Sequence, residues 1–266
     1  MEGQHIFFAF ILTAIAGLST GIGSLIALVA KHTNTKFLCA SLGFSAGVMI
    51  YVSFMEMMPG ALTQLTDVFG EKPATLYMIL AFFGGIAFIN LIDFAIPETA
   101  VNPHEITGVE DMKNEKNTLK RTGLFVAISI AIHNFPEGIA TFTSALGSLD
   151  VAIPITVAIA IHNIPEGIAV AVPIYHATGS RKKAFWYSFL SGLAEPFGAL
   201  IAYLFLLQFW SPAVSGIVLA AVAGIMVFIS LDELLPSAEK YGKHHISIMG
   251  LISGMLIMAV SLYLFI

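Results

Sequence analysis

The sequence has few charged residues and almost no cysteine. Charged residues make up 11% of the 266 residues and hydrophobic residues 57%, a balance that ordinary soluble domains of this length do not have. The single cysteine, Cys39, excludes an internal disulfide framework and a thiolate cluster for copper(I). The chain contains neither a GxxxxGKS/T nucleotide motif nor an HExxH metalloprotease motif, and no nucleic-acid partner is expected.

Long apolar runs dominate the sequence instead. Eight of them are long enough to cross a hydrocarbon core of ~30 Å as helices. These runs are 6–30, 37–58, 74–96, 123–146, 151–174, 184–209, 213–235 and 246–266. Because they leave little else, the sequence predicts an all-α polytopic membrane protein with eight transmembrane helices and a single transmembrane domain over residues 1–266.

Lysine and arginine are missing from all eight runs. Of the 12 basic residues, all except Lys72 fall in the loops on one side of the predicted bundle. These loops are 31–36, 97–122, 175–183 and 236–245. Basic residues in short loops mark the cytoplasmic side of a membrane protein. The distribution therefore predicts that the loop 97–122 is cytoplasmic and that both termini lie outside.

One segment of the chain recurs with the opposite direction through the membrane. SAGVMIYVSFMEMMPGA at 45–61 is similar to VAGIMVFISLDELLPSA at 222–238, with matching serine, glutamate and proline. Under the predicted topology, spans 1–3 and 6–8 form inverted repeats around a central antiparallel pair, spans 4 and 5, in a 3+2+3 arrangement. Inverted repeats are typical of secondary transporters, with the site near the bilayer midplane. Chance similarity within a small apolar alphabet is the alternative.

A polar motif occurs twice inside the predicted membrane region. AIHNFPEGIAT at 131–141 and AIHNIPEGIAV at 160–170 place His, Asn and Glu at positions i, i+1 and i+4, within about 100° of one helix face. The two motifs begin at similar depths of adjacent antiparallel spans, and the next span adds a carboxylate. The candidate metal ligands are His133, Asn134, Glu137, His162, Asn163, Glu166 and Glu195.

Carboxylates at this depth need a positive partner. An ionised carboxylate at the centre of a membrane helix costs about 2.5–3.5 kcal/mol, and the spans contain no basic residue to offset it. A divalent metal, or protons when the metal is absent, is the remaining candidate. Imidazole with carboxylate suits zinc, iron(II), manganese and cobalt, and spacing alone does not choose among them. A buried hydrogen-bonded network that only fastens helices is the alternative.

Two features beside the ligands fit this interpretation. Pro136 and Pro165 each remove one backbone hydrogen bond, which is expected to interrupt the helix and free carbonyl oxygens. Gly138 and Gly167, which follow the glutamates, allow neighbouring backbones to approach closely.

Carboxylates nearer the predicted span ends are weaker candidates. Glu56 with Met55 is a candidate ligand where metal enters, and Asp232 with Glu233 is a candidate where metal leaves. Solvation of a carboxylate close to a helix end explains each of these positions equally well.

The paired HNFPEG and HNIPEG, together with SFMEMMP, SGLAEP and DELLP, resemble the ZIP (Zrt-, Irt-like) metal transporter family over nearly the whole chain. The resemblance implies eight spans, a bacterial inner-membrane location and a binuclear centre. In that centre Glu137 and Glu166 bridge, His133 and His162 favour one metal, and Asn134, Asn163 and Glu195 complete the other. It also implies an elevator-like motion of spans 1, 4, 5 and 6 against 2, 3, 7 and 8, and is compatible with a homodimer.

Residues and resemblance together predict a metal transporter, not an enzyme, and no cofactor. The expected cargo is zinc, with iron(II), manganese, cobalt and cadmium as further candidates, taken into the cytoplasm by alternating access. An intramembrane zinc-dependent hydrolase and a passive metal channel are the alternatives.

Overall fold

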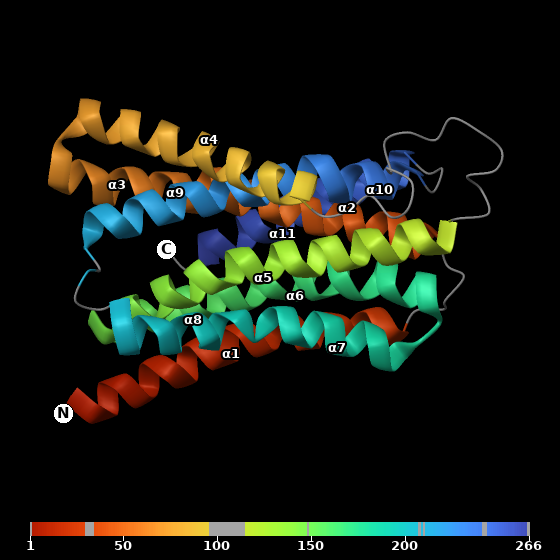
Figure 1. The fold of residues 1–266 in the computed structure, drawn as a ribbon, viewed down its shortest axis with the longest axis horizontal. Helices are drawn as coiled ribbons and strands as arrows, with labels where there is room; N and C mark the ends of the chain where they lie inside the picture. Colours follow the sequence, from red (N-terminus) through yellow and green to blue (C-terminus); the bar gives the residue numbers. More distant parts are fainter. Residues whose placement is uncertain are drawn as a thin grey trace.

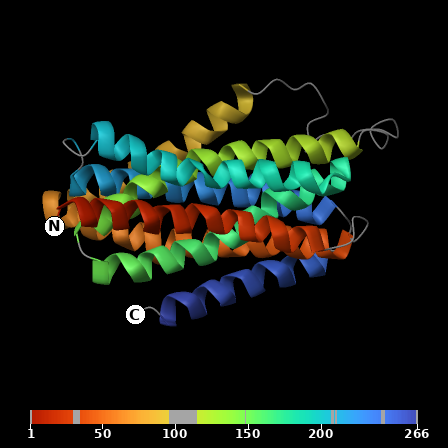
Figure 2. The ribbon, with the colours of Figure 1, turned by 90° about the horizontal axis from the view of Figure 1, so that it is seen from below.

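The described part of the chain is helical throughout. The computed structural model describes residues 2–29, 35–95, 115–147, 149–206, 209, 211–240 and 244–264. Its α-helices are α1 (Glu2–Val29), α2 (Thr35–Val52), α3 (Met58–Phe69), α4 (Glu71–Ala95), α5 (Glu115–Gly147), α6 (Leu149–Thr178), α7 (Arg181–Gly192), α8 (Ala194–Ile201), α9 (Pro212–Phe228), α10 (Leu235–Lys240) and α11 (His244–Leu264). Most of them run along the long axis of the molecule, and the two chain ends lie toward the same end of it (Figures 1 and 2).

In this described part, six helical segments are long and apolar enough to cross a membrane. They are His5–Ile26, Cys39–Phe69, Glu71–Leu91, Arg181–Phe205, Pro212–Asp232 and His244–Leu264. The two motif helices, α5 and α6, have 33 and 30 residues and pack within the same bundle (Figure 1). The prediction of an all-α polytopic membrane protein is confirmed. Eight spans in a 3+2+3 arrangement stay a prediction.

The helical run that begins at Thr35 extends further than the sequence indicates. Its expected span ends at Met58, just before a Pro-Gly pair that is typical of a loop. Instead, α2 continues through the π-helical turn η1 (Ser53–Met57) into α3, which ends at Phe69. Pro59 lies in the first turn of α3, where the missing N–H costs little, so the chain stays helical.

Helix ends follow ordinary local chemistry where the structure describes them. Gly70 and Gly179 have φ values of 77° and 65°, a left-handed conformation that glycine adopts without strain. Ser180 and Ser211 cap α7 and α9 by accepting backbone N–H hydrogen bonds. The expected loop 97–122 is shortened at its C-terminal end, because α5 already begins at Glu115, while 96–114 lie outside the described residues.

The sequence repeat is also a repeat of atomic contacts. Ser53 Oγ donates a hydrogen bond to the Met49 carbonyl at 2.7 Å, and Ser230 Oγ donates one to the Met226 carbonyl, also at 2.7 Å. Both serines are fully buried. The matched positions of the two segments therefore have the same local structure, as the interpretation of inverted repeats expects.

Both segments also change from α- to π-helix at this point. In η1 and in η4 (Ile229–Leu234), the N–H that follows the turn bonds to the serine carbonyl five residues earlier. The next residue in each case is a proline, Pro59 or Pro236, which has no N–H to donate. A π turn adds one residue and shifts the hydrogen-bond register, so it accommodates the missing donor without ending the helix.

The helices divide into two groups. The motif group consists of α1, α5, α6, α7 and α8, which pack mainly on one another. The frame group consists of α2, α3, α4, α9, α10 and α11, and its main contacts join α2 to α11 and α9 to α3 and α4. Between the groups, α2 packs on α6 and α5 packs on α9. The division matches the two sets of spans that the family resemblance implies.

Glycine contacts hold each group together. A Cβ built on Gly167 of α6 would lie 1.9 Å from the Thr20 carbonyl oxygen of α1, and one on Gly85 of α4 would lie 2.0 Å from the Ala221 carbonyl oxygen of α9. All the described glycines whose added Cβ would come within 3.0 Å of another helix make that contact inside their own group. The tightest backbone approaches therefore lie within the groups and not across their boundary.

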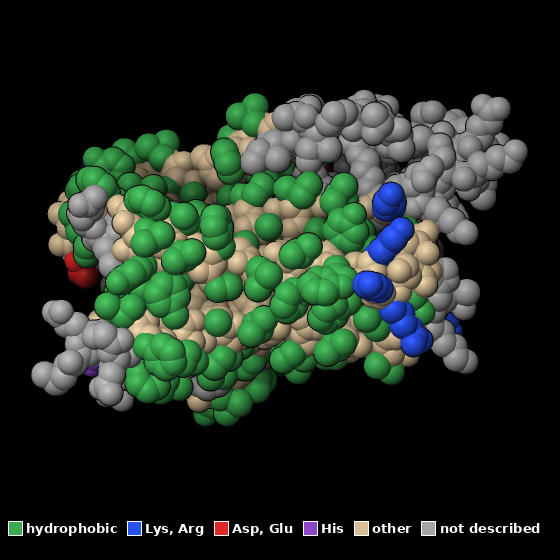
Figure 3. Space-filling view, turned by 60° about the horizontal axis from the view of Figure 1, so that its bottom comes forward, with side chains coloured by type: hydrophobic (Ala, Val, Ile, Leu, Met, Phe, Trp, Pro, Cys, Tyr) green, Lys and Arg blue, Asp and Glu red, His purple; other side chains and the backbone are tan. Residues whose placement is uncertain are grey.

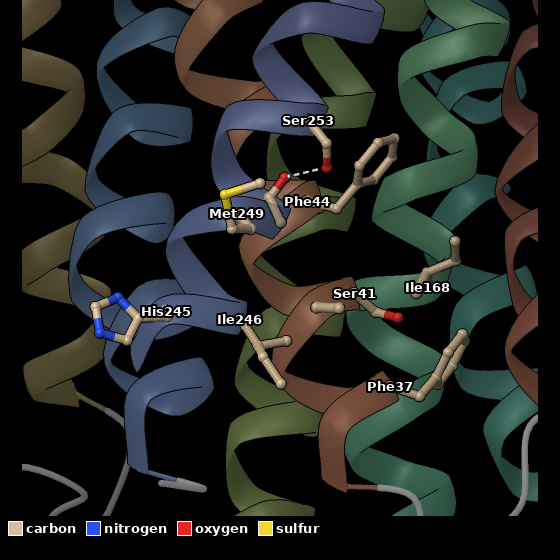
Figure 4. A pocket seen from close by; sticks show the side chains of 10 residues that line it. Phe37, Ser41, Phe44, Ile168, His245, Ile246, Met249 and Ser253 are labelled. Atoms are coloured by element: carbon tan, nitrogen blue, oxygen red, sulfur yellow. Dashed lines mark hydrogen bonds between the residues drawn. The ribbon is translucent and has the colours of Figure 1, made fainter. Parts of the chain in front are cut away.

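The boundary between the groups is mostly apolar and partly open, with a hydrogen bond from Ser45 Oγ to the Pro165 carbonyl across it. Met49 of α2 and Ile168 of α6 belong to one buried hydrophobic cluster that spans both groups. Beside it lies a cavity of about 570 Å³, lined by Phe37 and Phe44 of α2, by Ile168, and by residues of α11 (Figure 4). Apolar side chains with space beside them can slide past one another more easily than interlocked backbones.

Gly85→Ala should destabilise the protein strongly. Its new Cβ would overlap the Ala221 backbone, which cannot move without separating α4 from α9, and such overpacking costs up to about 3 kcal/mol. Thermal unfolding in detergent should show an apparent Tm lower by about 5–10 °C. The control is the neighbouring Gly84→Ala, because nothing lies within 4 Å of its added Cβ. Equal shifts for the two variants would contradict the packing account.

Candidate metal centre

Four of the six candidate ligands of the paired motif, and Glu195, are described in full. Asn134 and Glu137 on α5, Asn163 and Glu166 on α6, and Glu195 on α8 are all buried. The side chains of His133 and His162 lie outside the described residues, although their backbones belong to α5 and α6. Since α5 packs on α6 and on α8, the fold gathers ligands from three helices in one region.

The two prolines of the motif do not end their helices. The structure assigns α5 as unbroken from Glu115 to Gly147 and α6 from Leu149 to Thr178, where the sequence predicts an interruption. A proline removes one hydrogen bond, and helices packed on several neighbours stay helical across it. One carbonyl near the ligands has a different partner, since Ser45 Oγ of α2 donates to the Pro165 carbonyl at 2.6 Å.

The interruption lies instead beside Glu195. The helix that starts at Arg181 breaks at Leu193 and resumes as α8, where Pro196 cannot donate to the Gly192 carbonyl. This carbonyl oxygen lies only 2.5 Å from the position of a Cβ on Gly17, so α1 presses against the break. Glu195 lies in the first turn of α8, directly after this interruption, and accepts a hydrogen bond from Asn163 of the paired motif.

The fold brings two carboxylates, those of Glu137 and Glu166, within electrostatic range of a third, that of Glu195. Glu195 is fully buried, and the charges of Glu137 and Glu166 both act on it. Among the described side chains, however, no three of His, Cys, Asp and Glu are grouped closely enough to enclose an ion. A complete coordination shell built from this region therefore needs the two imidazoles or the asparagine oxygens as well.

Asn163 connects the motif to α8 and α1. Its Nδ2 donates to Glu195 Oε1 and, at 3.0 Å, to the carbonyl of Ala16. Asn163 Oδ1 and Glu195 Oε2 have no hydrogen-bond partner among the described residues. Both atoms are lone-pair acceptors, and leaving each buried and unsatisfied costs about 1–3 kcal/mol. A cation is the kind of ligand that satisfies both at once.

The motif glycines act as expected. A Cβ on Gly138 would lie 2.1 Å from the carbonyl oxygen of Glu195 and 2.6 Å from its Cα, so α5 and α8 touch at the ligand itself. Gly167 makes the equivalent close contact between α6 and α1. The position of each glutamate is therefore fixed by backbone contact one residue away.

The sequence analysis missed two groups that contact the site. The Ala16 carbonyl carries no side-chain signal and could not be found from sequence. Ser45 could have been found from the sequence, because the matching position in the other repeat segment is Val222. A hydroxyl at one of two otherwise matching apolar positions is a signal of a polar contact.

The weaker candidates lie in the π turns. Met55 is exposed and Glu56 half-buried in η1, and Asp232 is half-buried in η4, which packs against α5. The Glu233 side chain lies outside the described residues. The helical run that contains Glu56 continues to Phe69, so Glu56 does not lie at a helix end. Solvation at a helix end therefore does not explain the position of its carboxylate.

Comparisons with known proteins agree with this architecture. The model of the ZIP zinc transporter family matches residues 102–262. "Zinc transporter ZupT" of Streptococcus mutans is 65% identical over 263 residues, covering 99% of both chains. Proteins of the same name from Clostridium perfringens and Chlorobium phaeovibrioides are 58% identical over 279 residues and 59% over 259, covering at least 96% of each chain. Because the family model matches residues 102–262 and these relatives are similar over nearly their whole length, the chain belongs to the ZIP zinc transporter family.

Proposed function

We propose that the chain is a secondary transporter that carries a divalent metal, zinc above all, into the cytoplasm through the paired motif. The observation that carries the proposal is the buried Asn163–Glu195 pair beside two further carboxylates. The predicted spans hold no lysine or arginine that could neutralise them. The relatives' name, zinc transporter, supports zinc as the cargo. Iron(II), manganese, cobalt and cadmium share the ligand preference and are secondary cargoes.

The metal is bound by groups from three helices. Asn163 Oδ1 and Glu195 Oε2, the two acceptors without a partner among the described residues, hold one ion together with Asn134. Glu137 and Glu166 bridge this ion to a second one, which His133 and His162 hold. The alternative, a hydrogen-bonded network that only fastens helices, does not account for two acceptors of one contacting pair that have no partner among the described residues.

Transport proceeds by movement of the motif group against the frame group. The close glycine contacts inside each group support two rigid bodies, and the apolar boundary with its cavity supports sliding between them. The repeated serine hydrogen bonds and π turns of η1 and η4 support frame elements of equivalent build on opposite sides. Met55 and Glu56 then receive the metal on the outer side, and Asp232 and Glu233 release it on the inner side.

The proposal also includes a membrane topology. Eight spans, with α5 and α6 as the central antiparallel pair, bring both termini to one side, in agreement with the chain ends in Figures 1 and 2. The basic residues place that side outside a bacterial inner membrane, with 97–122 in the cytoplasm. A homodimer stays an expectation of the family resemblance.

Uptake of radioactive zinc into liposomes containing the purified protein tests the function. Saturable uptake above that of empty liposomes is expected. Uptake that rises linearly with zinc to high concentration would identify a passive channel instead. Zinc binding without any uptake would overturn transport, and the hydrolase alternative would return, although membership of a transporter family argues against it.

Ser45→Ala should raise the maximal rate of zinc uptake by up to about fivefold. Its hydroxyl lies 2.6 Å from the Pro165 carbonyl oxygen across the boundary and 3.0 Å from the Ser41 carbonyl oxygen of its own helix, and losing the bond to Pro165 shifts an equilibrium by about 1 kcal/mol. If the motif group slides against the frame group, this bond has to break in every transport cycle. Without the bond, the protein leaves the conformation described here more easily, and the rate of transport should rise. Rates of uptake at saturating zinc give the measurement.

Two further variants separate this effect from a loss of stability. Ser45→Thr keeps the hydroxyl and should behave as the native chain. Ser191→Ala removes a buried hydroxyl that bonds only within its own helix, to Ser188, and should leave the rate unchanged. A Ser45→Ala rate equal to or below the native rate would show that the bond is not broken during transport.

A further inference from the structure

An open groove follows the outer side of α7 and α8. Its first section, about 380 Å³, is lined by Ser180, Lys182, Lys183, Trp186, Tyr187 and Leu190. Its second section, about 510 Å³, shares Leu190 and continues along Leu193, Ala194, Pro196, Phe197 and Leu200. No aspartate or glutamate lines either described section. Because the two sections share Leu190, they lie next to each other, with two lysines lining one end and apolar side chains lining the other.

The chemistry changes steadily along this groove. Lys182, Trp186 and Leu190 are four residues apart, so they share one helix face over about 12 Å. All three are exposed, and the Trp186 ring is held edge-on against Phe189 at 5.6 Å between centroids. The three side chains match the parts of a phospholipid in order. A lysine cation suits the phosphate, an indole suits the ester region, and aliphatic carbon suits the acyl chain.

The surrounding surface fits the same ligand. Arg181 extends the exposed basic cluster, and Figure 3 shows Lys and Arg side chains gathered at one end of a mostly apolar face. Phe197 and Leu200 are exposed further along. Such a face is covered by lipid, and its basic end attracts an anionic headgroup in particular.

We propose that this groove is a binding site for one anionic phospholipid. Lys182 and Lys183 hold the phosphate, Trp186 lies at the ester level, and an acyl chain follows Leu190 to Leu200. The acyl chain of the lipid then lies over the interruption at Leu193. This is the outer side of the helical segment that carries Glu195 on its inner side. Basic residues that served only to orient the protein in the membrane would need neither the groove nor the indole.

Fluorescence quenching of Trp186 tests the proposal without any metal. The chain has two tryptophans, so Trp210→Phe leaves Trp186 as the only reporter. The protein is placed in phosphatidylcholine bilayers that contain a small fraction of brominated phosphatidylglycerol or of brominated phosphatidylcholine. Stronger quenching by the brominated phosphatidylglycerol is expected, and Lys182→Gln and Lys183→Gln should each reduce this preference by about fivefold.

The control variant is Lys72→Gln, an exposed lysine outside the groove, which should keep the preference. Lys182→Arg should also keep it, because the positive charge remains. Equal quenching by the two brominated lipids, or a preference that survives both lysine substitutions together, would overturn the proposal. Neither outcome depends on zinc transport, so the result stands apart from the test of function.

Discussion

Glu166→Ala should abolish saturable zinc uptake. The carboxylate is fully buried on α6, interacts with Glu195, and belongs to the motif that is repeated on α5. Removing a direct ligand should cost more than the 10- to 100-fold loss that is typical for a supporting residue, so a decrease of about 100-fold or more is expected. Glu137→Ala should behave in the same way, because the two glutamates occupy equivalent positions of the paired motif.

The expected loss concerns metal binding and not folding. A buried carboxylate without its cation destabilises the bundle, so Glu166→Gln should be at least as stable as the native chain when zinc is absent. Zinc at about 100 times its Kd should stabilise the native chain by about 2.7 kcal/mol and the variant hardly at all. Thermal unfolding with and without zinc measures this difference. The charge-matched control is Glu71→Ala, which removes an exposed carboxylate at the start of α4. In the uptake measurement, a native rate for Glu166→Ala would exclude the paired motif as the transport site.

Gly138→Ala should reduce zinc uptake almost as much, although it removes no ligand. The added Cβ would overlap the Glu195 backbone, at 2.1 Å from its oxygen and 2.6 Å from its Cα, and α8 would have to move away from α5. A displacement of about 1 Å of a reacting group can cost about 100-fold in rate. Liposome uptake at several zinc concentrations should therefore show a loss of tenfold or more, with weaker apparent affinity.

The same contact can be tested from the other helix. Gly198→Ala on α8 would meet the Phe135 carbonyl of α5 at 2.1 Å and should have a similar effect. Gly60→Ala is the control, since its nearest neighbour is the flexible end of the Leu219 side chain at 3.3 Å. If Gly138→Ala and Gly198→Ala both transport zinc at the native rate, the α5–α8 contact does not position Glu195.

The sequence predicted those features that depend on composition and on spacing. The helical membrane fold follows from apolar runs without basic residues, and the segments 45–61 and 222–238 reveal their relation because serine and proline recur at fixed positions. The convergence of Asn163 and Glu195 follows from similar depth in adjacent spans. The structure supplies the hydrogen bond between them and the backbone contacts at the motif glycines.

The features that the sequence did not predict depend on hydrogen-bond register and on tertiary contact. Pro59 resembles a helix end, yet the π turn before it keeps the chain helical to Phe69. Pro165 resembles a break, yet α6 continues because its neighbours hold it on several sides. The interruption at Leu193 goes with Pro196, but the close approach of Gly17 of α1 to Gly192 beside it is a tertiary contact that no local pattern encodes.

The equal hydrogen bonds of Ser53 and Ser230 have a consequence for direction. Under the proposed topology, the two segments that carry these bonds cross the bilayer in opposite directions, so the moving group meets a frame segment of the same local build on either side. The frame then gives little preference for one direction of movement, and the zinc gradient and the membrane potential set the direction of transport. Reversing both is expected to reverse the net flow of zinc.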